Sequence, residues 1–507
     1  MSTRFKAALI AAVLALASLP AVATAGPQAC EDRNNNTINK LLECVTIDGV
    51  REHQAAFQEI ADDNNGIRTS GTPGYDASAA YVADRLEDAG YDVTLQPFQF
   101  NAFIQLGPST LEQTAPGAVS YVEDTDYNLM SQTDPGDATG FVTAVDLALG
   151  DPSTSTSGCE ATDFAGFPAG NIALMQRGAC AFGLKGDNAA AAGAVGAIIF
   201  NQGNTPDRTG LINGTLGSGY SGGIPVFFAT FDLGVEWAGT SGLELHMIAD
   251  VLRGEATSYN VLAESTTGDP DNTIMAGAHL DSVNQGPGIQ DNGSGSAALI
   301  EVAEQMAKVK PKNKVRFAWW GAEESGLVGS TIYVNGLSQE EQDQISLYLN
   351  FDMIGSPNYV FFVYDGDDSD GVGEGPGPEG SAQIEEFYNS FYEARDLPFK
   401  GTDFSGRSDY GPFIAVGIPA GGLFTGAEGI KTDEEAAIWG GTAGEQYDPC
   451  YHLACDTFDN VSLEALDVNS DAVAASVLTY AMNTESVNGQ PGKGNFKPQN
   501  ADLLPNG

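Results

Sequence analysis

Strand-like and helical segments alternate along the chain from about residue 257, and this alternation constrains the fold more than any other feature. Short apolar runs predict buried strands at TIMAGA, KVRFAWW and SLYLNFDMI. Helical spacing of apolar residues occurs between the first two, in SGSAALIEVAEQMAK, and after the third, in GSAQIEEFYNSFYEAR. Strands that alternate with helices form a mostly parallel sheet with helices on both faces. The chemistry of such sheets lies at the carboxyl ends of the strands.

The first half of the chain combines two kinds of sequence. Residues 49–62 and 76–89 have the apolar spacing of helices, and YDVTLQPFQF then alternates as a strand does. Between about 103 and 255, Gly, Ser, Thr and Asp become frequent and long helical periods disappear. Short strands are predicted there at NIALMQRG, AIIFN and GIPVFFAT, with the helix LKGDNAAAAGAVGA after the first. We therefore predict a compact β-rich insert within an α/β domain.

Residues 1–25 have the features of a secretory signal peptide. A basic start with Arg4 and Lys6 precedes an apolar run, and the segment ends in the small-x-small pattern of residues 23–25. The apolar run is too short for a comfortable membrane span. We therefore expect an exported protein, in the extracellular medium rather than the periplasm.

The six cysteines indicate disulfides rather than a metal site. An exported chain favours disulfide formation, and a cysteine zinc site would require a CxxC repeat that the sequence does not contain. Local pairing is the simplest of the possible connectivities. The expected pairs are Cys30 with Cys44, Cys159 with Cys180, and Cys450 with Cys455.

The charge balance excludes two classes of partner. The chain has 68 Asp and Glu residues against 22 Lys and Arg residues, a formal net charge of −46. Binding to nucleic-acid phosphates or to anionic membrane surfaces requires a basic face. We therefore expect no nucleic acid and no membrane as partner, whereas metal cations, cationic substrates or a saline medium suit so acidic a chain.

Added salt is expected to raise the melting temperature of this protein. Like charges repel one another in the folded state, and the Debye length falls from about 30 Å at 0.01 M to about 8 Å at 0.15 M salt, so that salt screens the repulsion. Thermal unfolding followed by circular dichroism at these two ionic strengths measures the effect. A melting temperature that stays constant or falls would leave solubility as the sole consequence of the charge.

Side chains that can bind metal or protons follow the predicted strands or lie in nearby loops. They are His279 after TIMAGA, Asp291 before a helix, Glu323 and Glu324 after VRFAWW, Asp352 after SLYLNF, and His452 in CYHLAC. Asp281 lies two residues after His279, so the two side chains face the same way if the chain stays extended. A carboxylate placed there can accept the second imidazole N–H of a metal-bound histidine.

These residues together favour a metal hydrolase. Each has an ordinary explanation when taken alone, such as a turn-forming Asp or a solvated Glu pair, but their joint occurrence at successive strand ends is harder to explain in that way. Imidazole and carboxylate ligands suit Zn²⁺ or a similar divalent ion. Two histidines and three carboxylates fit two ions that share a carboxylate better than one structural zinc.

Several segments closely resemble the secreted bacterial dizinc aminopeptidases, a leucyl-type zinc exopeptidase family. They read AGAHLDSVNQGPGIQDNGSGSAALIEVA, RFAWWGAEESGLVGS, YLNFDMIGSPN, GRSDYGPF, PAGGLFTGAEGIKT and YDPCYHLACDT, within a resemblance that covers roughly 45–100 and 257–482. Residues 159–202 resemble a protease-associated domain, which this family often carries before its metal-binding core. The resemblance implies the zinc-exopeptidase fold, a mixed, mostly parallel sheet between helices, with a smaller β-rich domain.

The resemblance also implies a role for each site residue. His279 and Asp352 would hold one zinc, Glu324 and His452 a second, and Asp291 would bridge the two ions, with Glu323 as general base, Asp281 orienting His279, Tyr451 stabilising the oxyanion, and Arg407, Phe424 and Met353 lining the substrate site. The attacking group would be a hydroxide bound to both ions. A cis peptide bond is expected between residues 291 and 292.

A calcium site is implied less completely. Some relatives bind calcium through two Asp residues, matched here by Asp467 and Asp471, and through an N-terminal Asp. Cys44 occupies that third position in this chain, so the calcium ligand set is incomplete.

We expect a secreted zinc aminopeptidase that removes apolar N-terminal residues from peptides or proteins. A dizinc carboxypeptidase of the same superfamily would need a basic cluster for the substrate carboxylate, and the metal-core segments contain mainly Arg407. A glutaminyl-cyclase-like enzyme would share the fold with one zinc. An inactive binding protein would have lost ligands that are all present here.

The expected organisation places two interrupted parts of a peptidase domain around the insert. The segments are a signal peptide at 1–25, an N-terminal extension at 26–44, the peptidase domain at 45–102 and 256–485, the protease-associated insert at 103–255, and a flexible tail at 486–507. A monomer is expected, while the oligomeric state and the exact side-chain preference stay open.

Overall fold

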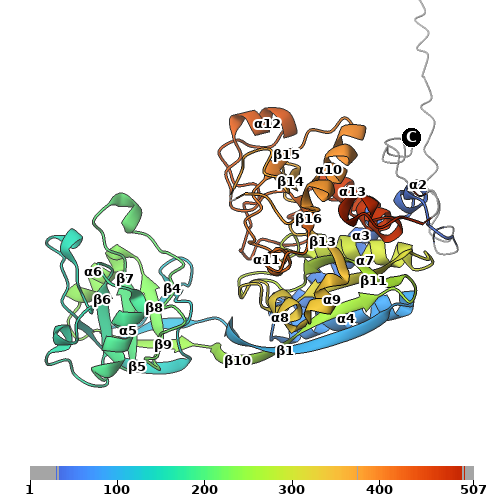
Figure 1. The fold of residues 1–507 in the computed structure, drawn as a ribbon. Coiled ribbons are helices and arrows are strands. Elements are labelled where there is room, and N and C mark those ends of the chain that lie inside the picture. Colours follow the sequence, from blue (N-terminus) through green and yellow to red (C-terminus); the bar gives the residue numbers. More distant parts are fainter. Residues whose placement is uncertain (1–29, 31–32, 374, 494–495, 497–507) are drawn as a thin grey trace, which may run out of the picture.

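The computed structural model describes residues 30, 33–373, 375–493 and 496, which form two lobes (Figure 1). Each lobe is built around an eight-stranded sheet. The expected signal peptide at residues 1–25 lies outside the described residues, as do 26–29 of the predicted extension and most of 494–507. No helix in the described ranges is long and apolar enough to cross a membrane.

The sheet of the larger lobe has the order β1-β10-β12-β11-β13-β16-β14-β15. Its strands are β1 (Asp92–Gln105), β10 (Val251–Glu264), β11 (Asp269–His279), β12 (Asn313–Trp320), β13 (Ile345–Phe351), β14 (Phe362–Tyr364), β15 (Lys400–Thr402) and β16 (Ala420–Phe424). The four central strands β12, β11, β13 and β16 are parallel, and antiparallel pairs join them to the outer strands on each side. The predicted mixed α/β sheet is therefore confirmed.

Helices cover both faces of this sheet because its strands are apolar on both sides. One face packs against α3 (Ile47–Asp63), α4 (Pro73–Ala89), α7 (Gly293–Met306), α10 (Ser381–Ala394) and α13 (Leu463–Met482), and the other against α8 (Val328–Gly336) and α11 (Gly411–Ala415). Adjacent tryptophans of β12 illustrate the alternation, since Trp319 belongs to the first core and Trp320 to the second. Two short helices, α9 (Gln339–Asp343) and α12 (Asp433–Trp439), lie in the connections.

The smaller lobe contains the segment between β1 and β10. Its sheet has the order β3-β2-β9-β5-β6-β7-β8-β4. Its elements are β2 (Thr110–Ala115), β3 (Val119–Tyr121), β4 (Tyr127–Leu129), β5 (Gly136–Ala144), β6 (Ile172–Gln176), β7 (Gly196–Phe200), β8 (Val226–Ala229), β9 (Glu244–Ala249), α5 (Phe182–Ala191), α6 (Phe231–Gly239) and the 3₁₀ turns η1 (Pro152–Thr154), η2 (Ala161–Phe164) and η3 (Pro206–Arg208). Two apolar clusters pack against this sheet, so the lobe has its own core.

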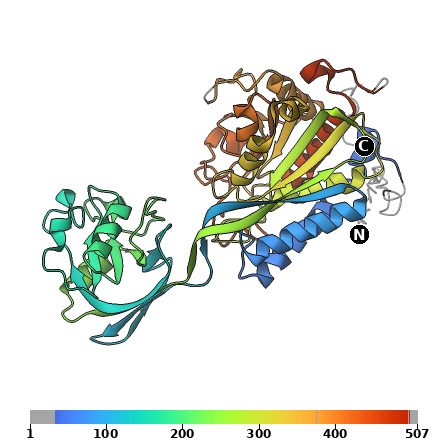
Figure 2. The same cartoon turned by 60° about the horizontal axis from the view of Figure 1, so that its bottom comes forward.

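A long antiparallel ribbon joins the two lobes. Strands β1 and β10 pair without interruption from Asp92 opposite Glu264 to Gln105 opposite Val251. Figure 2 shows this ribbon crossing the larger lobe and continuing toward the smaller one. The insert is therefore attached through extended backbone rather than a loose linker.

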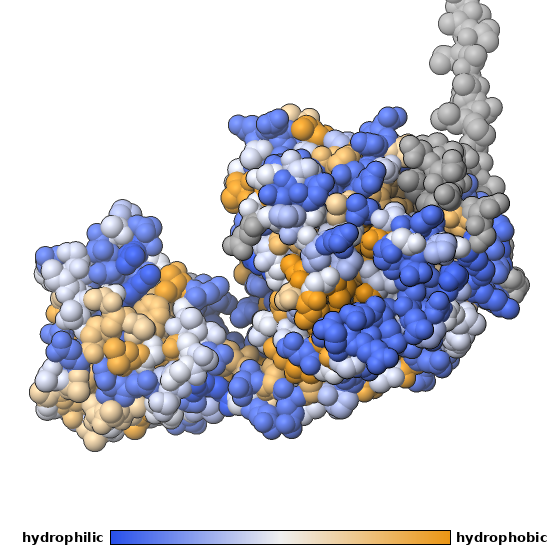
Figure 3. All heavy atoms as spheres, viewed as in Figure 1, coloured by the Kyte–Doolittle hydropathy of each residue, from blue (hydrophilic) through white to orange (hydrophobic). Residues whose placement is uncertain are grey.

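Viewed as in Figure 1, the surface is mostly hydrophilic, with separate apolar patches on both lobes (Figure 3).

Both ends of the described chain are more structured than the sequence indicates. Helix α2 (Ile38–Leu42), within the predicted N-terminal extension, buries its apolar residues in the core of the larger lobe. Helix α14 (Glu485–Asn488) lies at the start of the predicted flexible tail, where Val487 packs on the same core and Asn488 Nδ2 donates to Asn272 Oδ1 at 2.8 Å. Both helices place only a few apolar residues, among polar ones, against the core, and so short a segment shows no clear periodicity in the sequence.

Three disulfides join the cysteines in local pairs. The bonds connect Cys30 with Cys44, Cys159 with Cys180, and Cys450 with Cys455. The first bond connects the segment before α2 to the residues just after that helix. The second lies in the smaller lobe, and the third closes the loop that contains His452. Such bonds persist in oxidising compartments, which is consistent with a protein outside the cytoplasm.

Candidate active site

The parallel strands bring the predicted site residues to one edge of the larger sheet. His279 is the last residue of β11, Asp352 follows β13, and Glu323 and Glu324 follow β12. Strand β11 lies between β12 and β13 in the same direction, so these three strand ends are neighbours. Asp291 reaches the same edge from the loop before α7, and His452 reaches it from the Cys450–Cys455 loop.

Five of these side chains form two groups of three around a shared carboxylate. His279 Nε2 lies 3.2 Å from Asp291 Oδ1 and 3.2 Å from Asp352 Oδ1. On the other side, His452 Nε2 lies 3.2 Å from Asp291 Oδ2 and 3.2 Å from Glu324 Oε2. Ligand atoms at about 2.0–2.1 Å from a tetrahedral ion are separated by about 3.3 Å, so each group fits one such ion. The two oxygens of Asp291 face different groups.

The electrostatics of the site favour bound cations. Burial alone would lower the pKa of both histidines, but the surrounding carboxylates outweigh it. They raise the pKa of His279 well above its usual value and that of His452 to about 10. Two buried oxygens, Glu324 Oε1 and Asp352 Oδ1, accept no hydrogen bond from the described residues. A site that attracts protons this strongly and leaves carboxylate oxygens unsatisfied is suited to divalent metal ions.

Glu323 lies beside these groups in a setting that favours its protonated form. Burial raises the pKa of Glu323 well above its usual value, and the nearby charge of Glu324 raises it further, although His279 acts in the opposite direction. A carboxylate whose pKa is raised accepts a proton more readily than an ordinary glutamate does. Glu323 and Glu324 are neighbours in sequence but have different surroundings, since Glu324 pairs with His452.

Asp281 contacts the site differently from the sequence prediction. His279 Nδ1 lies 3.1 Å from the main-chain oxygen of Asp281, whereas the Asp281 carboxylate is 3.8 Å away. The carboxylate instead accepts the main-chain N–H of Glu323 at 3.1 Å. The main-chain N–H of Leu280 still donates to the carbonyl of Trp320, and at Asp281 it is the carbonyl group that faces the imidazole. The carboxylate thus fixes the backbone at Glu323 rather than the ring of His279.

Three further residues position the site, and the sequence alone did not predict them. Asp456 accepts the main-chain N–H groups of Gln290 at 2.8 Å and of Asp291 at 3.0 Å. Buried Arg68 donates to the carbonyls of residues 280, 287 and 288 and so holds the loop between His279 and Asp291. Ser408 Oγ donates to Asp352 Oδ2 at 2.6 Å. The sequence offers one indication of these positioning roles, which is that Asp456 lies four residues after His452.

The remaining predicted residues line the open cavity above these side chains. Tyr451, Arg407, Phe424 and Met353 all face it. The ring of Tyr451 stacks on that of His452 with centroids 3.8 Å apart, and burial raises the pKa of its hydroxyl, which therefore stays protonated. Arg407 pairs with Glu428 at 3.0 Å. The peptide bond between residues 291 and 292 is cis, as expected.

The predicted calcium residues already have a positively charged neighbour. Asp471 Oδ2 lies 3.4 Å from Nη2 of Arg395. Burial raises the pKa of Asp471 to about 7, while Arg395 acts against that rise. Cys44 is bonded to Cys30 and supplies no carboxylate. The pair Asp467 and Asp471 therefore stays a prediction that the surrounding contacts do not strengthen.

Comparison with known proteins identifies relatives over nearly the whole chain. Residues 260–477 match the model of peptidase family M28, and residues 138–237 match the PA domain. An aminopeptidase of Pseudomonas aeruginosa is 52% identical over 464 residues, which cover 91% of this chain and 86% of that protein. Leucine aminopeptidase 2 of Trichophyton equinum is 44% identical over 352 residues, which cover 68% and 70%. The structure of a zinc aminopeptidase from Bacillus subtilis superimposes with a TM-score of 0.58 at 24% identity, covering 85% and 94%.

Proposed function

Because the chain belongs to peptidase family M28 as a metallo-aminopeptidase with a PA domain, we propose that it depends on two zinc ions and prefers apolar N-terminal residues. The observation that carries the proposal is the pair of His-carboxylate groups that share Asp291, with all four nitrogen–oxygen distances at 3.2 Å. His279 and Asp352 would hold one ion, and His452 and Glu324 the other. The Bacillus subtilis relative is described as a zinc enzyme, which supports this choice of metal.

Different residues of the chain perform the separate steps of hydrolysis. Bound zinc supplies a Lewis acid that lowers the pKa of a water molecule and polarises a carbonyl group. Glu323 takes the proton of the attacking water and returns it to the leaving amine, as its raised pKa allows. The hydroxyl of Tyr451 donates to the oxygen of the tetrahedral intermediate. Asp281 holds the backbone of Glu323 and so keeps its carboxylate in place.

The charge of the cavity supports hydrolysis at the N-terminus of the substrate. A free α-amino group is cationic and suits a cavity lined by Glu323, Glu428 and Asp403. A carboxypeptidase would need basic groups for the substrate carboxylate, and Arg407 is the one Lys or Arg among the described residues that line the cavity. Arg407 is already paired with Glu428. A glutaminyl-cyclase-like reaction with one zinc would leave the second His-carboxylate group without a role.

The preference for apolar residues rests on Phe424 and Met353. Both line the cavity next to the ligands, and Phe424 stacks on Phe362 with centroids 6.0 Å apart. The Trichophyton relative is named a leucine aminopeptidase, which supports the same preference.

We further propose that residues 45–102 and 256–485 form the peptidase domain, that 103–255 form the protease-associated domain, and that the enzyme is secreted and acts as a monomer.

Acetylation of the substrate N-terminus is expected to abolish cleavage. The blocked amine has no charge to interact with the acidic cavity, whereas free Leu-p-nitroanilide and free Leu-initiated peptides should be hydrolysed. The measurement compares initial rates on three matched peptides, one free, one N-acetylated and one with a C-terminal reporter. Faster cleavage of the acetylated peptide, or release of the C-terminal residue, would contradict an aminopeptidase with this site.

A further inference from the structure

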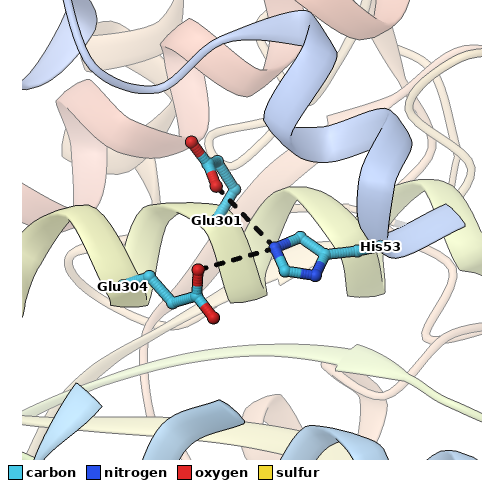
Figure 4. A group of neighbouring side chains, drawn as sticks. All are labelled: His53, Glu301 and Glu304. Atoms are coloured by element: carbon cyan, nitrogen blue, oxygen red, sulfur yellow. Dashed lines mark ion pairs between the residues drawn. The ribbon is translucent and has the colours of Figure 1, made fainter. Parts of the chain in front are cut away.

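We propose that His53, Glu301 and Glu304 form a third metal site, remote from the active site, that binds Zn²⁺ or a similar divalent ion between α3 and α7. His53 comes from α3, and both glutamates come from the last turns of α7 (Figure 4). One oxygen of each glutamate faces His53 Nε2, with distances of 3.7 Å to Glu301 and 3.9 Å to Glu304. Helix α7 begins two residues after Asp291, and its rise places Glu301 about 12 Å farther along the axis.

The distances exclude a hydrogen bond but fit a shared ion. A separation of 3.7 Å is too long for a hydrogen bond between nitrogen and oxygen. Two ligands at about 2.1 Å from one ion lie between about 3.0 Å at a right angle and about 4.2 Å on opposite sides. Both separations at this site fall in that range, and they exceed the separation of about 3.3 Å around a tetrahedral ion by about 0.4 and 0.6 Å, so small side-chain movements would complete a tetrahedral site. One imidazole and two carboxylates suit zinc, and water can complete its coordination.

The buried histidine has no other partner for Nε2. The side chain of His53 is 1% exposed, and Nε2 makes no hydrogen bond within the part of the chain that the structure describes. Its other nitrogen, Nδ1, lies 2.7 Å from the hydroxyl of Tyr81. If Nε2 carried a proton, the nearby carboxylates should be drawn into hydrogen-bond distance. If Nδ1 carries it, the lone pair of Nε2 faces two carboxylates. A cation between these groups would make their close approach favourable.

The packing leaves room for these carboxylates and fixes their orientation. A Cβ atom on Gly49 of α3 would lie 2.5 Å from Glu301 Oε1, so glycine at this position makes space for the carboxylate. Arg85 of α4 holds Glu304 through Nε at 2.5 Å and Nη2 at 2.8 Å. Arg85 also pairs with Glu52 at 3.2 Å, so the carboxylates near His53 outnumber this guanidinium. Glu304 is 19% exposed, so a cation can enter along its side chain.

Metal content of matched variants tests the site. Wild-type protein and the variants are incubated with excess Zn²⁺, separated from free metal by gel filtration and analysed for zinc by mass spectrometry. His53→Gln and Glu301→Gln should each contain one zinc per chain less than the wild type, with unchanged turnover because neither residue touches the active site. The control variants His246→Asn, from an exposed His–Asp pair of the smaller lobe, and Glu59→Gln, from the exposed side of α3, should retain the wild-type content.

Zinc counts of His53→Gln and Glu301→Gln equal to that of the wild type would overturn the proposal and leave the three side chains as a buried polar cluster without metal. A second measurement decides the question even if these variants fail to fold. Crystals of the wild-type enzyme soaked in Zn²⁺ should show an anomalous difference peak at the zinc edge between His53 Nε2 and the two carboxylates. Peaks at the active site without one at this position would contradict the third site while leaving the proposed function intact.

Discussion

Removal of metal is expected to abolish peptide hydrolysis by this enzyme, and zinc should restore it. A metal ion contributes several kcal/mol of transition-state stabilisation, and since about 1.4 kcal/mol corresponds to a factor of ten, the expected loss is about 1,000-fold or more. Without metal, His279, His452, Glu324 and Asp352 surround Asp291 but offer no Lewis acid. The measurement is turnover of Leu-p-nitroanilide after dialysis against a chelator, then after addition of zinc.

Restoration by zinc should depend on pH in a defined direction. The carboxylates raise the pKa of His452 to about 10 and that of His279 well above its usual value, so both imidazoles are protonated in the metal-free enzyme at neutral pH. Zinc must displace these protons, so its affinity should increase as the pH rises toward 10. Chelator already saturated with calcium is the control. Full turnover by protein that contains no divalent metal would contradict the account.

Replacement of Glu323 by Gln is expected to lower turnover by about 100-fold to 10,000-fold, the usual contribution of a positioned acid–base group. Gln keeps the size of the side chain, and the main-chain N–H of residue 323 can still reach Asp281. The fold and the zinc content should therefore persist while the proton acceptor is lost. Steady-state kinetics on a free Leu substrate measures the effect, which should appear in kcat rather than in KM.

The periodic elements of the fold could be predicted from the sequence, and the non-periodic ones could not. Strands β11, β12 and β13 and helices α7 and α10 follow apolar runs or helical spacing closely. Helix α13 gives a weaker signal, because every residue from Ala472 to Met482 is buried and only its first half carries a polar side with Glu464, Asp467 and Asp471. Helices α2 and α14 are too short to show a period. Their positions depend on contacts with distant parts of the chain.

The site residues could be predicted from the sequence for a related reason. His279, Glu323, Glu324 and Asp352 all lie at strand ends, where parallel topology brings chemistry together. The backbone conformation around them could not be predicted, because Ala322, Met353 and His452 adopt positive φ values of 55–56° that residues other than glycine seldom adopt. Left-handed backbone at non-glycine residues requires support from the surrounding structure. That support comes from residues far apart in sequence.

The contacts that hold the site also explain the one geometric difference from expectation. Arg68 and Asp456 each lie more than 160 residues along the chain from the loop that they hold, so no local pattern links them to the site. Arg68 donates to the carbonyl of Leu280, and the main-chain N–H of Leu280 donates to the carbonyl of Trp320, so the backbone at residue 280 is held on both sides. In this arrangement the carbonyl of Asp281, rather than its carboxylate, faces the imidazole.

The division of roles between the two adjacent glutamates is the central claim, and one paired measurement tests it most directly. Bound zinc and turnover are determined side by side for Glu323→Gln and Glu324→Gln. The account predicts that Glu323→Gln retains its zinc and loses turnover, whereas Glu324→Gln loses part of its zinc and recovers activity in excess metal, because Glu324 lies 3.2 Å from His452 in one of the two ligand groups. Loss of zinc from Glu323→Gln with retention in Glu324→Gln would reverse the assignment. Full activity of both variants would place the active site elsewhere.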